Sequence, residues 1–276
     1  MQHSESTFEG FSGTQLYYQK WEPEEKSKAI LIIIHGIGEH SGRYMNIVNY
    51  FTPLDITIYS FDNRGHGRSP GKRGHILNWE EFREDVKCFI EMIQEFDGHL
   101  PVFLMGHSLG GLIVLNYALH YPQGIKAIIA SGPVLVPPSI SHFLLFLSRA
   151  LSKILPSFSV DTKLNVHAIS RDPEVVRAYQ EDPLVHSKAS ARLGTEFTRT
   201  MNWTFQHAEE FSLPLMIVHG GSDQLVPVTG SYEFYKRMTS EDREIHIYEG
   251  GFHEPHNDID RIKVLKDIEK WIQNHI

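Results

Sequence analysis

Two serines of this 276-residue chain lie in a Gly-x-Ser-x-Gly pattern, which can hold a hydroxyl on a sharp turn. They are Ser69, within Gly67-Arg-Ser-Pro-Gly71, and Ser108, within Gly106-His-Ser-Leu-Gly110. The pattern supports nucleophilic catalysis where a strand turns directly into a helix, because that turn exposes the serine oxygen above a sheet. Glycine is needed on both sides because a Cβ there would collide with the neighbouring strand and helix.

Only Ser108 has the flanking segments that this chemistry requires. The apolar run Val102–Met105 precedes it, and an apolar segment with helical character follows it as far as His120. Ser69 is followed at once by Pro70 and by further glycines, which are typical of a loop. We therefore predict that Ser108 is the nucleophile and that Ser69 takes no part in catalysis.

A serine hydroxyl attacks well only when a base removes its proton and an acid orients that base. In chains that use this serine turn, the acid and then the base follow later strands. Asp223 follows the run Leu215–His219 and is the predicted acid, the alternative being a turn aspartate that caps the next helix. His253 follows a glycine turn after the run Glu244–Tyr248 and is the predicted base. We expect His256 on the rim, as a supporting or substrate-binding group.

Acyl transfer also needs N–H donors for the oxyanion that develops on the carbonyl oxygen. One predicted donor is the backbone N–H of Leu109, the residue after the nucleophile. The other is the N–H of Ile37 in the loop His35-Gly-Ile-Gly38, where glycines allow the backbone to approach closely. In isolation this loop could also be read as a simple turn.

Short apolar runs alternate with longer helical patterns over most of the chain, which predicts β-α-β units and a parallel sheet. Strands are expected at residues 16–21, 29–35, 56–61, 102–105, 125–130, 215–219 and 244–248, and helices at 79–96, 108–120, 231–238 and 258–276. The first run alternates as in an edge hairpin. The later runs are nearly continuous, as in strands that are buried on both faces.

This alternation stops between residues 133 and 211, where helical patterns prevail at 141–155, 174–179 and 187–211 and no buried strand is expected. We predict a sheet domain made of residues 1–132 and 212–276, interrupted by a helical cap over 133–211. Two independent domains are the alternative, but each side then has too few strands to close a core. The apolar stretch 142–155 is expected to be either a buried cap helix or a lid that faces lipid.

Composition excludes several classes of function. The 26 Lys and Arg against 34 Asp and Glu give a net charge of −8, so no nucleic-acid partner is expected. The single cysteine, Cys88, cannot form an internal disulfide and is expected to be a helix thiol. The 17 histidines show no metal-ligand spacing, and we predict no metal or cofactor. The polar N-terminus does not resemble a signal peptide and 142–155 is too short to span a bilayer, so we expect a cytoplasmic protein that can touch a membrane or micelle through its cap.

Five segments together resemble the monoacylglycerol lipase and lysophospholipase branch of the α/β hydrolases. They are HGIGEHSGRY at 35–44, DNRGHGRSPGKRGH at 62–75, GHSLGG at 106–111, YQEDPL at 179–184 and YEGGFH at 248–253. The resemblance implies an α/β-hydrolase fold, with a mostly parallel central sheet flanked by helices and a helical cap inserted after the sixth strand. It also implies a catalytic triad of Ser108, Asp223 and His253, with Ile37 and Leu109 as oxyanion donors.

The same resemblance implies that polar groups at the pocket floor hold a glycerol head. The corresponding positions are Glu39, Arg43, Tyr179 and His256. For Glu39 and Arg43 the alternative is an exposed ion pair at the start of a helix. Ile37 replaces a smaller residue of the family, which would narrow the acyl entrance, and Val226 stands where animal members have a cysteine.

We therefore expect a serine esterase that hydrolyses monoacylglycerols to fatty acid and glycerol through an acyl-enzyme on Ser108. The alternatives are a lysophospholipase, or a broad carboxylesterase or thioesterase of the same fold. A proline-type aminopeptidase would need carboxylates for the substrate amine, and Glu174, Glu181 and Asp182 form no obvious cluster. A non-catalytic receptor would usually have an incomplete triad.

Overall fold

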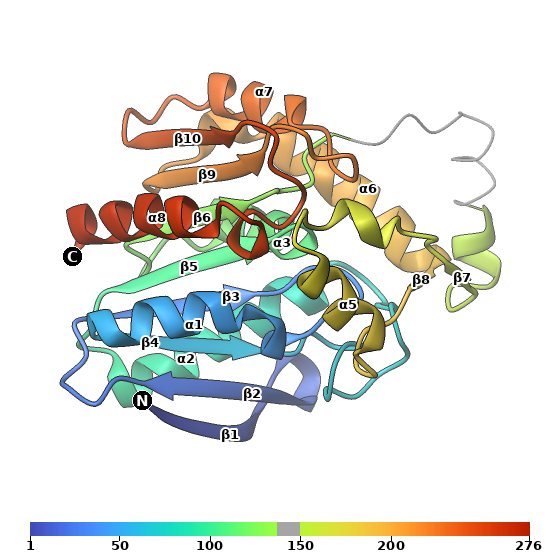
Figure 1. The fold of residues 1–276 in the computed structure, drawn as a ribbon. Helices are drawn as coiled ribbons and strands as arrows, with labels where there is room; N and C mark the ends of the chain where they lie inside the picture. Colours follow the sequence, from blue (N-terminus) through green and yellow to red (C-terminus); the bar gives the residue numbers. More distant parts are fainter. Residues whose placement is uncertain (137–149) are drawn as a thin grey trace.

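The computed structural model describes residues 1–136 and 150–276, and its centre is an eight-stranded sheet of order β1-β2-β4-β3-β5-β6-β9-β10 (Figure 1). The strands are β1 (Gln2–Glu9), β2 (Gln15–Glu22), β3 (Ala29–Ile34), β4 (Ile56–Phe61), β5 (Val102–His107), β6 (Ala127–Ser131), β9 (Leu215–Gly220) and β10 (Arg243–Tyr248). β1 pairs antiparallel with β2, and β2 antiparallel with β4; the other neighbours pair in parallel. The predicted edge hairpin and parallel sheet are confirmed.

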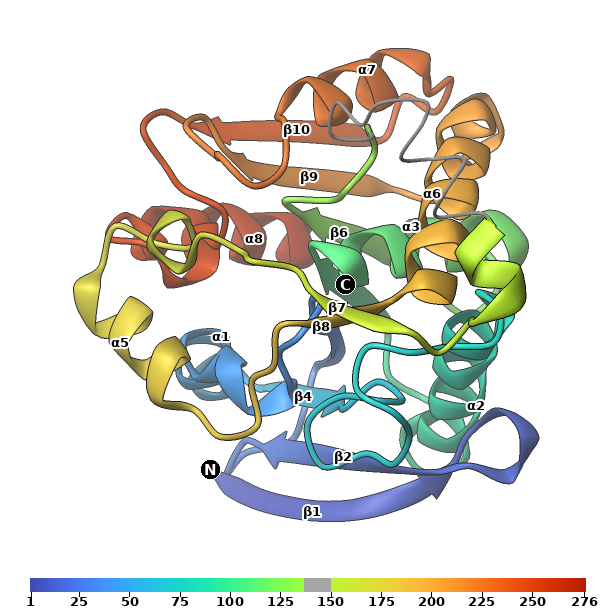
Figure 2. The same cartoon turned by 90° about the vertical axis from the view of Figure 1, so that its right-hand side faces the viewer.

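Helices cover both faces of this sheet (Figure 2). The helices are α1 (Met45–Phe51), α2 (Glu80–Asp97), α3 (Leu109–His120), α7 (Thr229–Arg237) and α8 (Arg261–His275). Side chains of β3 alternate between two cores: Ile30 and Ile32 belong to the core that includes residues of α2 and α3, and Leu31 and Ile33 to the core that includes residues of α1 and α8. A strand whose two faces are both buried must be apolar throughout, which explains the continuous run in the sequence.

The parallel strands end at one edge of the sheet, and the predicted site residues lie in the loops at that edge. The loop 35–40 follows β3, Ser108 follows β5, Asp223 follows β9 and His253 follows β10. Ligands of open α/β sheets bind outside the carboxyl ends of the strands. The topology therefore brings together residues that are far apart in the sequence.

Between β6 and β9 the described residues form the elements that were expected to be a cap. Residues 150–154 are helical, followed by β7 (Ser159–Asp161), α5 (Pro173–Glu181), β8 (Lys188–Ser190) and α6 (Ala191–Gln206). α5, β7 and β8 lie beyond the carboxyl edge of the sheet (Figures 1 and 2). The short antiparallel pair of β7 and β8 was not expected, because three-residue strands with exposed side chains carry no apolar pattern.

Two of the three helices expected in this region, at 174–179 and 187–211, are found with corrected bounds as α5 and α6. α6 begins at Ala191 and not at 187, because the Ser190 side chain accepts a hydrogen bond from the N–H of Leu193 and caps the helix there. Most of the helix expected at 141–155, with its apolar residues Phe143–Leu147, lies outside the described residues. The boundaries of a separate cap at 133 and 211 stay a prediction.

Candidate active site

Ser108 occupies a strained turn between β5 and α3. Its backbone angles are φ 54° and ψ −113°, a conformation that L-residues rarely adopt and that clusters at functional sites. A Cβ on Gly106 would lie 2.2 Å from the carbonyl oxygen of Gly110, and one on Gly110 would lie 2.0 Å from that of Ile34. Only glycine allows this approach of strand and helix, so the strand–turn–helix unit expected around Ser108 is present.

The second serine of the repeated pattern has a different environment. The Ser69 hydroxyl donates to the carbonyl oxygen of Asp62 and accepts from the N–H of Tyr17. Its side chain therefore links a loop to the N-terminal hairpin. A hydroxyl used in this way for backbone hydrogen bonds stabilises the fold and is not available as a nucleophile.

Asp223 and His253 form a hydrogen-bonded pair. The distance from His253 Nδ1 to Asp223 Oδ2 is 2.7 Å, and the aspartate side chain is fully buried. Asp223 Oδ1 accepts from the N–H groups of Leu225 and Val226, so it also serves the turn role considered as its alternative. Burial alone would raise the pKa of Asp223, but hydrogen bonds from His219 and His253 outweigh it and hold that pKa well below its usual range. The group is therefore a carboxylate at neutral pH.

His253 lies beside the turn that carries Ser108. Its ring centroid is 4.7 Å from that of His107, the residue before the serine. A Cβ on Gly132 would lie 3.4 Å from His253 Cε1, and the Ser108 N–H donates to the carbonyl oxygen of Ser131. The histidine and the serine thus pack against the same end of β6.

Two backbone N–H groups beside Ser108 have no hydrogen-bond acceptor among the described residues. They belong to Ile37 and Leu109. Leu109 is the first residue of α3, where N–H groups have no partner within the helix. A Cβ on Gly36 would lie 3.3 Å from Ser108 Cβ, which places the Ile37 loop directly against the serine. An N–H group that has no acceptor within the protein can donate to a ligand oxygen, so both can serve as oxyanion donors.

Arg43 and two glutamates form a buried ion network. Arg43 Nη1 is 2.6 Å from Glu39 Oε2, and the guanidinium also binds Glu254 through two hydrogen bonds of 2.7 and 2.9 Å. Glu39 is 3% exposed and Glu254 is 2% exposed. The alternative considered for Glu39 and Arg43, an exposed ion pair at a helix start, is therefore wrong. No local pattern could indicate the buried network, because its third member, Glu254, lies 211 residues away from Arg43 in the chain.

His256 was expected on the rim, and this is also wrong. It is 1% exposed and stacks on Tyr44 with ring centroids 5.1 Å apart and an interplanar angle of 8°. Burial lowers the pKa of His256 to about 4, so the ring is neutral at pH 7. Within the part of the chain that the structure describes, neither ring nitrogen has a hydrogen-bond partner. Buried polar atoms are rarely left unpaired, so a polar ligand or a water is expected here.

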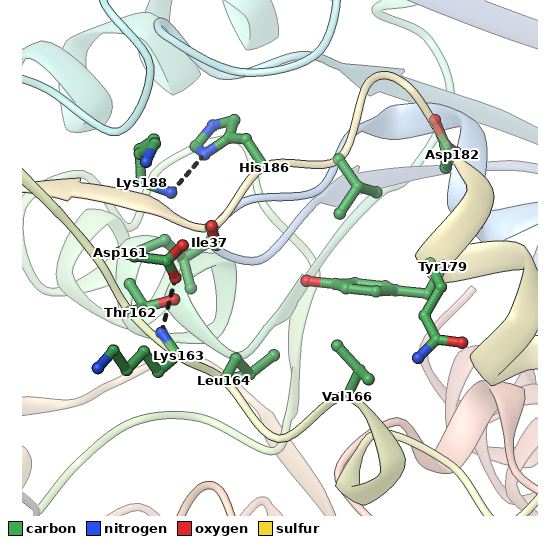
Figure 3. A pocket seen from close by; sticks show the side chains of 13 residues that line it. Ile37, Asp161, Thr162, Lys163, Leu164, Val166, Tyr179, Asp182, His186 and Lys188 are labelled. Carbon is green, nitrogen blue, oxygen red and sulfur yellow. Dashed lines mark hydrogen bonds between the residues drawn. The ribbon is translucent and has the colours of Figure 1, made fainter.

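A cavity of about 540 Å³ opens beside the site (Figure 3). Its apolar wall consists of Ile37, Leu164, Val166 and Val185, with Tyr179 directing its hydroxyl inward. The same tyrosine ring covers the guanidinium of Arg43 at 4.5 Å. The remaining lining residues are polar, and the apolar wall of a cavity of this size is suited to a hydrocarbon chain. Of the residues predicted for the site, Ile37 and Tyr179 line this cavity.

Two further residues of the site were not predicted. Glu254 carries the charge that pairs with Arg43, and His219 Nε2 lies 3.1 Å from Asp223 Oδ2. A charged residue directly after the predicted base, in a loop rich in glycine and proline, was an available signal for Glu254. His219 ends the strand before the acid, but its role depends on packing that the sequence does not display.

Known proteins resemble this chain over nearly its whole length. The profile of the family described as serine aminopeptidase, S33, matches residues 25–260. A monoacylglycerol lipase of Mycolicibacterium smegmatis is 36% identical over 275 residues, which is 99% of this chain and 98% of that one. Phospholipase YtpA of Bacillus subtilis is 30% identical, over 91% of this chain and 98% of its own. The crystal structure of Paleococcus ferrophilus monoacylglycerol lipase has a TM-score of 0.87 and 33% identity, covering 95% of this chain and 99% of that one.

Proposed function

This chain belongs to the serine aminopeptidase S33 family of α/β hydrolases, and on that premise we propose that it hydrolyses monoacylglycerols to a free fatty acid and glycerol. The observation that carries the proposal is a buried polar floor and a cavity with an apolar wall, which meet at the loop beside Ser108, where Ile37 lines the cavity. Glu39 Oε1 and Ser108 Cβ both lie close to Gly36, at 2.7 and 3.3 Å from the position of a Cβ there. A substrate with a small polar head and one apolar tail fits this division.

The reaction is an acyl transfer through Ser108. Its hydroxyl attacks the ester carbonyl while His253 Nε2 takes the proton, and the Nδ1–H donates to the Asp223 carboxylate, which fixes the tautomer. The oxyanion accepts hydrogen bonds from the N–H groups of Ile37 and Leu109. His253 then gives the proton to the glycerol oxygen, whose bond to the acyl carbon breaks. Water, deprotonated by His253, attacks the acyl-enzyme and releases the fatty acid and the serine.

The charge of the polar floor favours a neutral head group. Two carboxylates, Glu39 and Glu254, share one guanidinium, so the network carries a net charge of −1. A phosphate placed beside it would meet like charge in a buried site, which opposes binding. Glycerol hydroxyls carry no charge and can both donate to and accept from the unpaired nitrogens of His256. This argues for monoacylglycerol over lysophospholipid.

The aminopeptidase alternative needs a carboxylate that is free to bind a substrate ammonium. Glu174 and Glu181 are exposed, and Asp182 is paired with His40. In the floor each oxygen of Glu39 and Glu254 already accepts a hydrogen bond from the protein. An incoming amine would have to displace one of these donors.

Access to an aggregated lipid is proposed to occur through the region around β7. Ile154, Leu155, Phe158 and Val160 have exposures of 76%, 54%, 49% and 53%. Neighbouring exposed apolar side chains of this kind are suited to contact a membrane or micelle surface. Among the described residues no helix is both long and apolar enough to cross a bilayer.

The test is a comparison of kcat/KM on esters and amides with matched acyl groups. A monoacylglycerol should exceed the methyl ester of the same acid, the corresponding lysophospholipid and an aminoacyl amide, each by about tenfold or more. Ser108→Ala should remove all four activities, which would assign them to one site. Greater efficiency on the lysophospholipid or the amide would refute the assignment to monoacylglycerols.

A further inference from the structure

The loop that carries Ile37 is in contact with residues 182–190, which follow α5. The N–H of His186 donates to the carbonyl oxygen of Gly38 at 2.8 Å. His40 Nε2 lies 2.8 Å from Asp182 Oδ2. Both contacts are made within three residues of the Ile37 amide, by a segment that belongs to neither the triad nor the polar floor.

The hydrogen bond between His40 and Asp182 has a defined direction. His40 Nδ1 accepts from the N–H of Gly42 at 3.2 Å, so Nε2 carries the hydrogen and donates to the carboxylate. The other oxygen of Asp182 accepts from the N–H of Leu184 at 2.8 Å. The histidine is 8% exposed. A hydrogen bond from a nearby backbone N–H therefore orients each of the two side chains, independently of the hydrogen bond between them.

The two backbones are also in direct steric contact. Gly38 has a φ of 76°, and a Cβ on it would lie 2.2 Å from the carbonyl oxygen of His186. The segment is in turn anchored to the sheet domain, because His186 Nε2 donates to the carbonyl oxygen of Gly65 and the Ser190 N–H donates to that of Gly74. A displacement of residues 182–190 would therefore be transmitted to Gly38.

On the other side of Ile37 the loop is fixed by the Gly36 N–H, which donates to Glu39 Oε1 at 2.6 Å. Ile37 thus lies between two restrained glycines. We propose that the contacts of Asp182 with His40 and of His186 with Gly38, together the oxyanion clamp, hold the Ile37 N–H in the position that stabilises the oxyanion. Asp182 and His40 are then positioning residues for ester hydrolysis, which rests on the role of Ile37 proposed above.

The clamp also forms part of the cavity wall. Asp182, Val185 and His186 line the cavity together with Ile37 (Figure 3). A residue that only shapes this wall would affect esters whose acyl chain reaches it. A residue that positions the oxyanion donor affects every ester, including acetate. This difference separates the clamp from a role in acyl binding.

Two substitutions of His40 provide a matched test. In His40→Gln the side-chain amide can still donate to Asp182, whereas in His40→Asn the shorter side chain can accept from Gly42 but cannot reach Asp182. Removal of one whole oxyanion donor costs about 10²- to 10³-fold in kcat, so a misplaced donor should cost about tenfold. We expect His40→Asn to lower kcat about tenfold on both p-nitrophenyl acetate and p-nitrophenyl decanoate, with KM little changed. His40→Gln should stay within about threefold of wild type.

Asp182→Ala is the second variant, and Glu181→Gln, at an exposed position one residue earlier, is its control. Asp182→Ala should also lower kcat on both esters, and its affinity for a trifluoromethyl ketone, which forms an oxyanion with the serine, should fall by a similar factor. Unchanged kcat in Asp182→Ala and His40→Asn, a loss confined to the decanoate, or equal losses in the two His40 variants would overturn the clamp. A wild-type enzyme that hydrolyses neither ester would instead contradict the proposed function.

Discussion

Arg43 and Glu254 form an ion pair with two hydrogen bonds, 2.7 and 2.9 Å long, between segments 211 residues apart. Glu254 directly follows His253 in the chain. The pair therefore fixes the loop of the proposed base to the segment that follows the oxyanion loop. Both side chains are buried, and removing one member of a buried pair leaves a charge without full compensation.

Glu254→Gln should lower the free energy of unfolding by about 3 kcal/mol, the lower end for a broken buried pair, because Glu39 still neutralises Arg43. Urea unfolding at pH 7 measures the loss. Glu249→Gln makes the same charge change at an exposed position of the same loop, and it should stay within about 0.5 kcal/mol of wild type. Equal effects of the two substitutions would show that the ion pair contributes little.

Ser108→Ala should abolish ester hydrolysis and labelling by a fluorophosphonate while the thermal unfolding midpoint changes little. Ser69→Ala should keep activity within a few fold, but it loses the hydrogen bonds to Asp62 and Tyr17 and so should cost about 1 to 2 kcal/mol of stability. Ser108→Ala should therefore have the larger effect on activity, and Ser69→Ala the larger effect on stability. Labelling that survives in Ser108→Ala but is lost in Ser69→Ala would reverse the assignment.

Asp223→Asn should reduce kcat by about 10⁴-fold, because an amide that accepts from the turn N–H groups presents its NH₂ to His253 and favours the wrong tautomer. His219→Gln should have a much smaller effect, since His219 contacts the same carboxylate oxygen but is not the proposed base, and a glutamine amide can still donate to that oxygen. Both variants are compared by kcat on a p-nitrophenyl ester. A loss in His219→Gln that matches the loss in Asp223→Asn would contradict this order.

The sheet and its main helices could be predicted because their patterns are local. A strand of a parallel sheet that is covered on both faces is mostly apolar, and β3 is apolar throughout; α2 repeats apolar residues at helical spacing. Element ends were less predictable, since the start of α6 depends on the Ser190 cap. β7 and β8 were not predicted because each has only three residues, too few for an apolar pattern to be visible.

The site residues Ser108, Asp223 and His253 could be predicted because each follows its own apolar run, and parallel strands end at the same edge of a sheet. What the sequence did not reveal was burial. Glu39 and Arg43 resemble a surface pair until Glu254 joins them, and His256 resembles a rim residue until Tyr44 covers its ring. These properties arise from contacts between distant segments, for which no spacing rule exists.

The buried His256 should make stability depend on pH. Its pKa is about 4 in the folded protein against roughly 6.5 when unfolded, because burial disfavours the cation more than Glu39 and Glu254 favour it. The unfolded chain then binds more protons between these values, so stability is complete above about pH 6.5 and is lost as pH falls towards 4. The loss amounts to about 3 kcal/mol. Other buried histidines, such as His66 and His107, also have a pKa lowered by burial, so the measure is the difference between wild type and His256→Gln in urea unfolding. That difference should change by this amount across the range; a difference that is constant with pH would argue against the prediction.

The last prediction concerns Glu39, whose two carboxylate oxygens accept hydrogen bonds from the Gly36 N–H, the Tyr44 hydroxyl and the Arg43 guanidinium. If this group orders a floor that binds glycerol, Glu39→Gln should reduce kcat/KM on a monoacylglycerol well beyond its effect on the methyl ester of the same acid. A site built to bind a hydroxyl discriminates strongly against analogues without it. The ratio of the two efficiencies, which should fall about tenfold or more in the variant, cancels any common effect on the oxyanion loop.

Glu254→Gln is the matched comparison, since it removes the other carboxylate of Arg43 without touching Gly36. Both variants should lower the ratio if the network as a whole binds the head group. A common loss on both esters in Glu39→Gln, with the ratio unchanged, would mean that Glu39 acts only on the oxyanion loop. The glycerol head would then have to be bound without this carboxylate, by groups such as His256, with its unpaired nitrogens, and the Tyr179 hydroxyl.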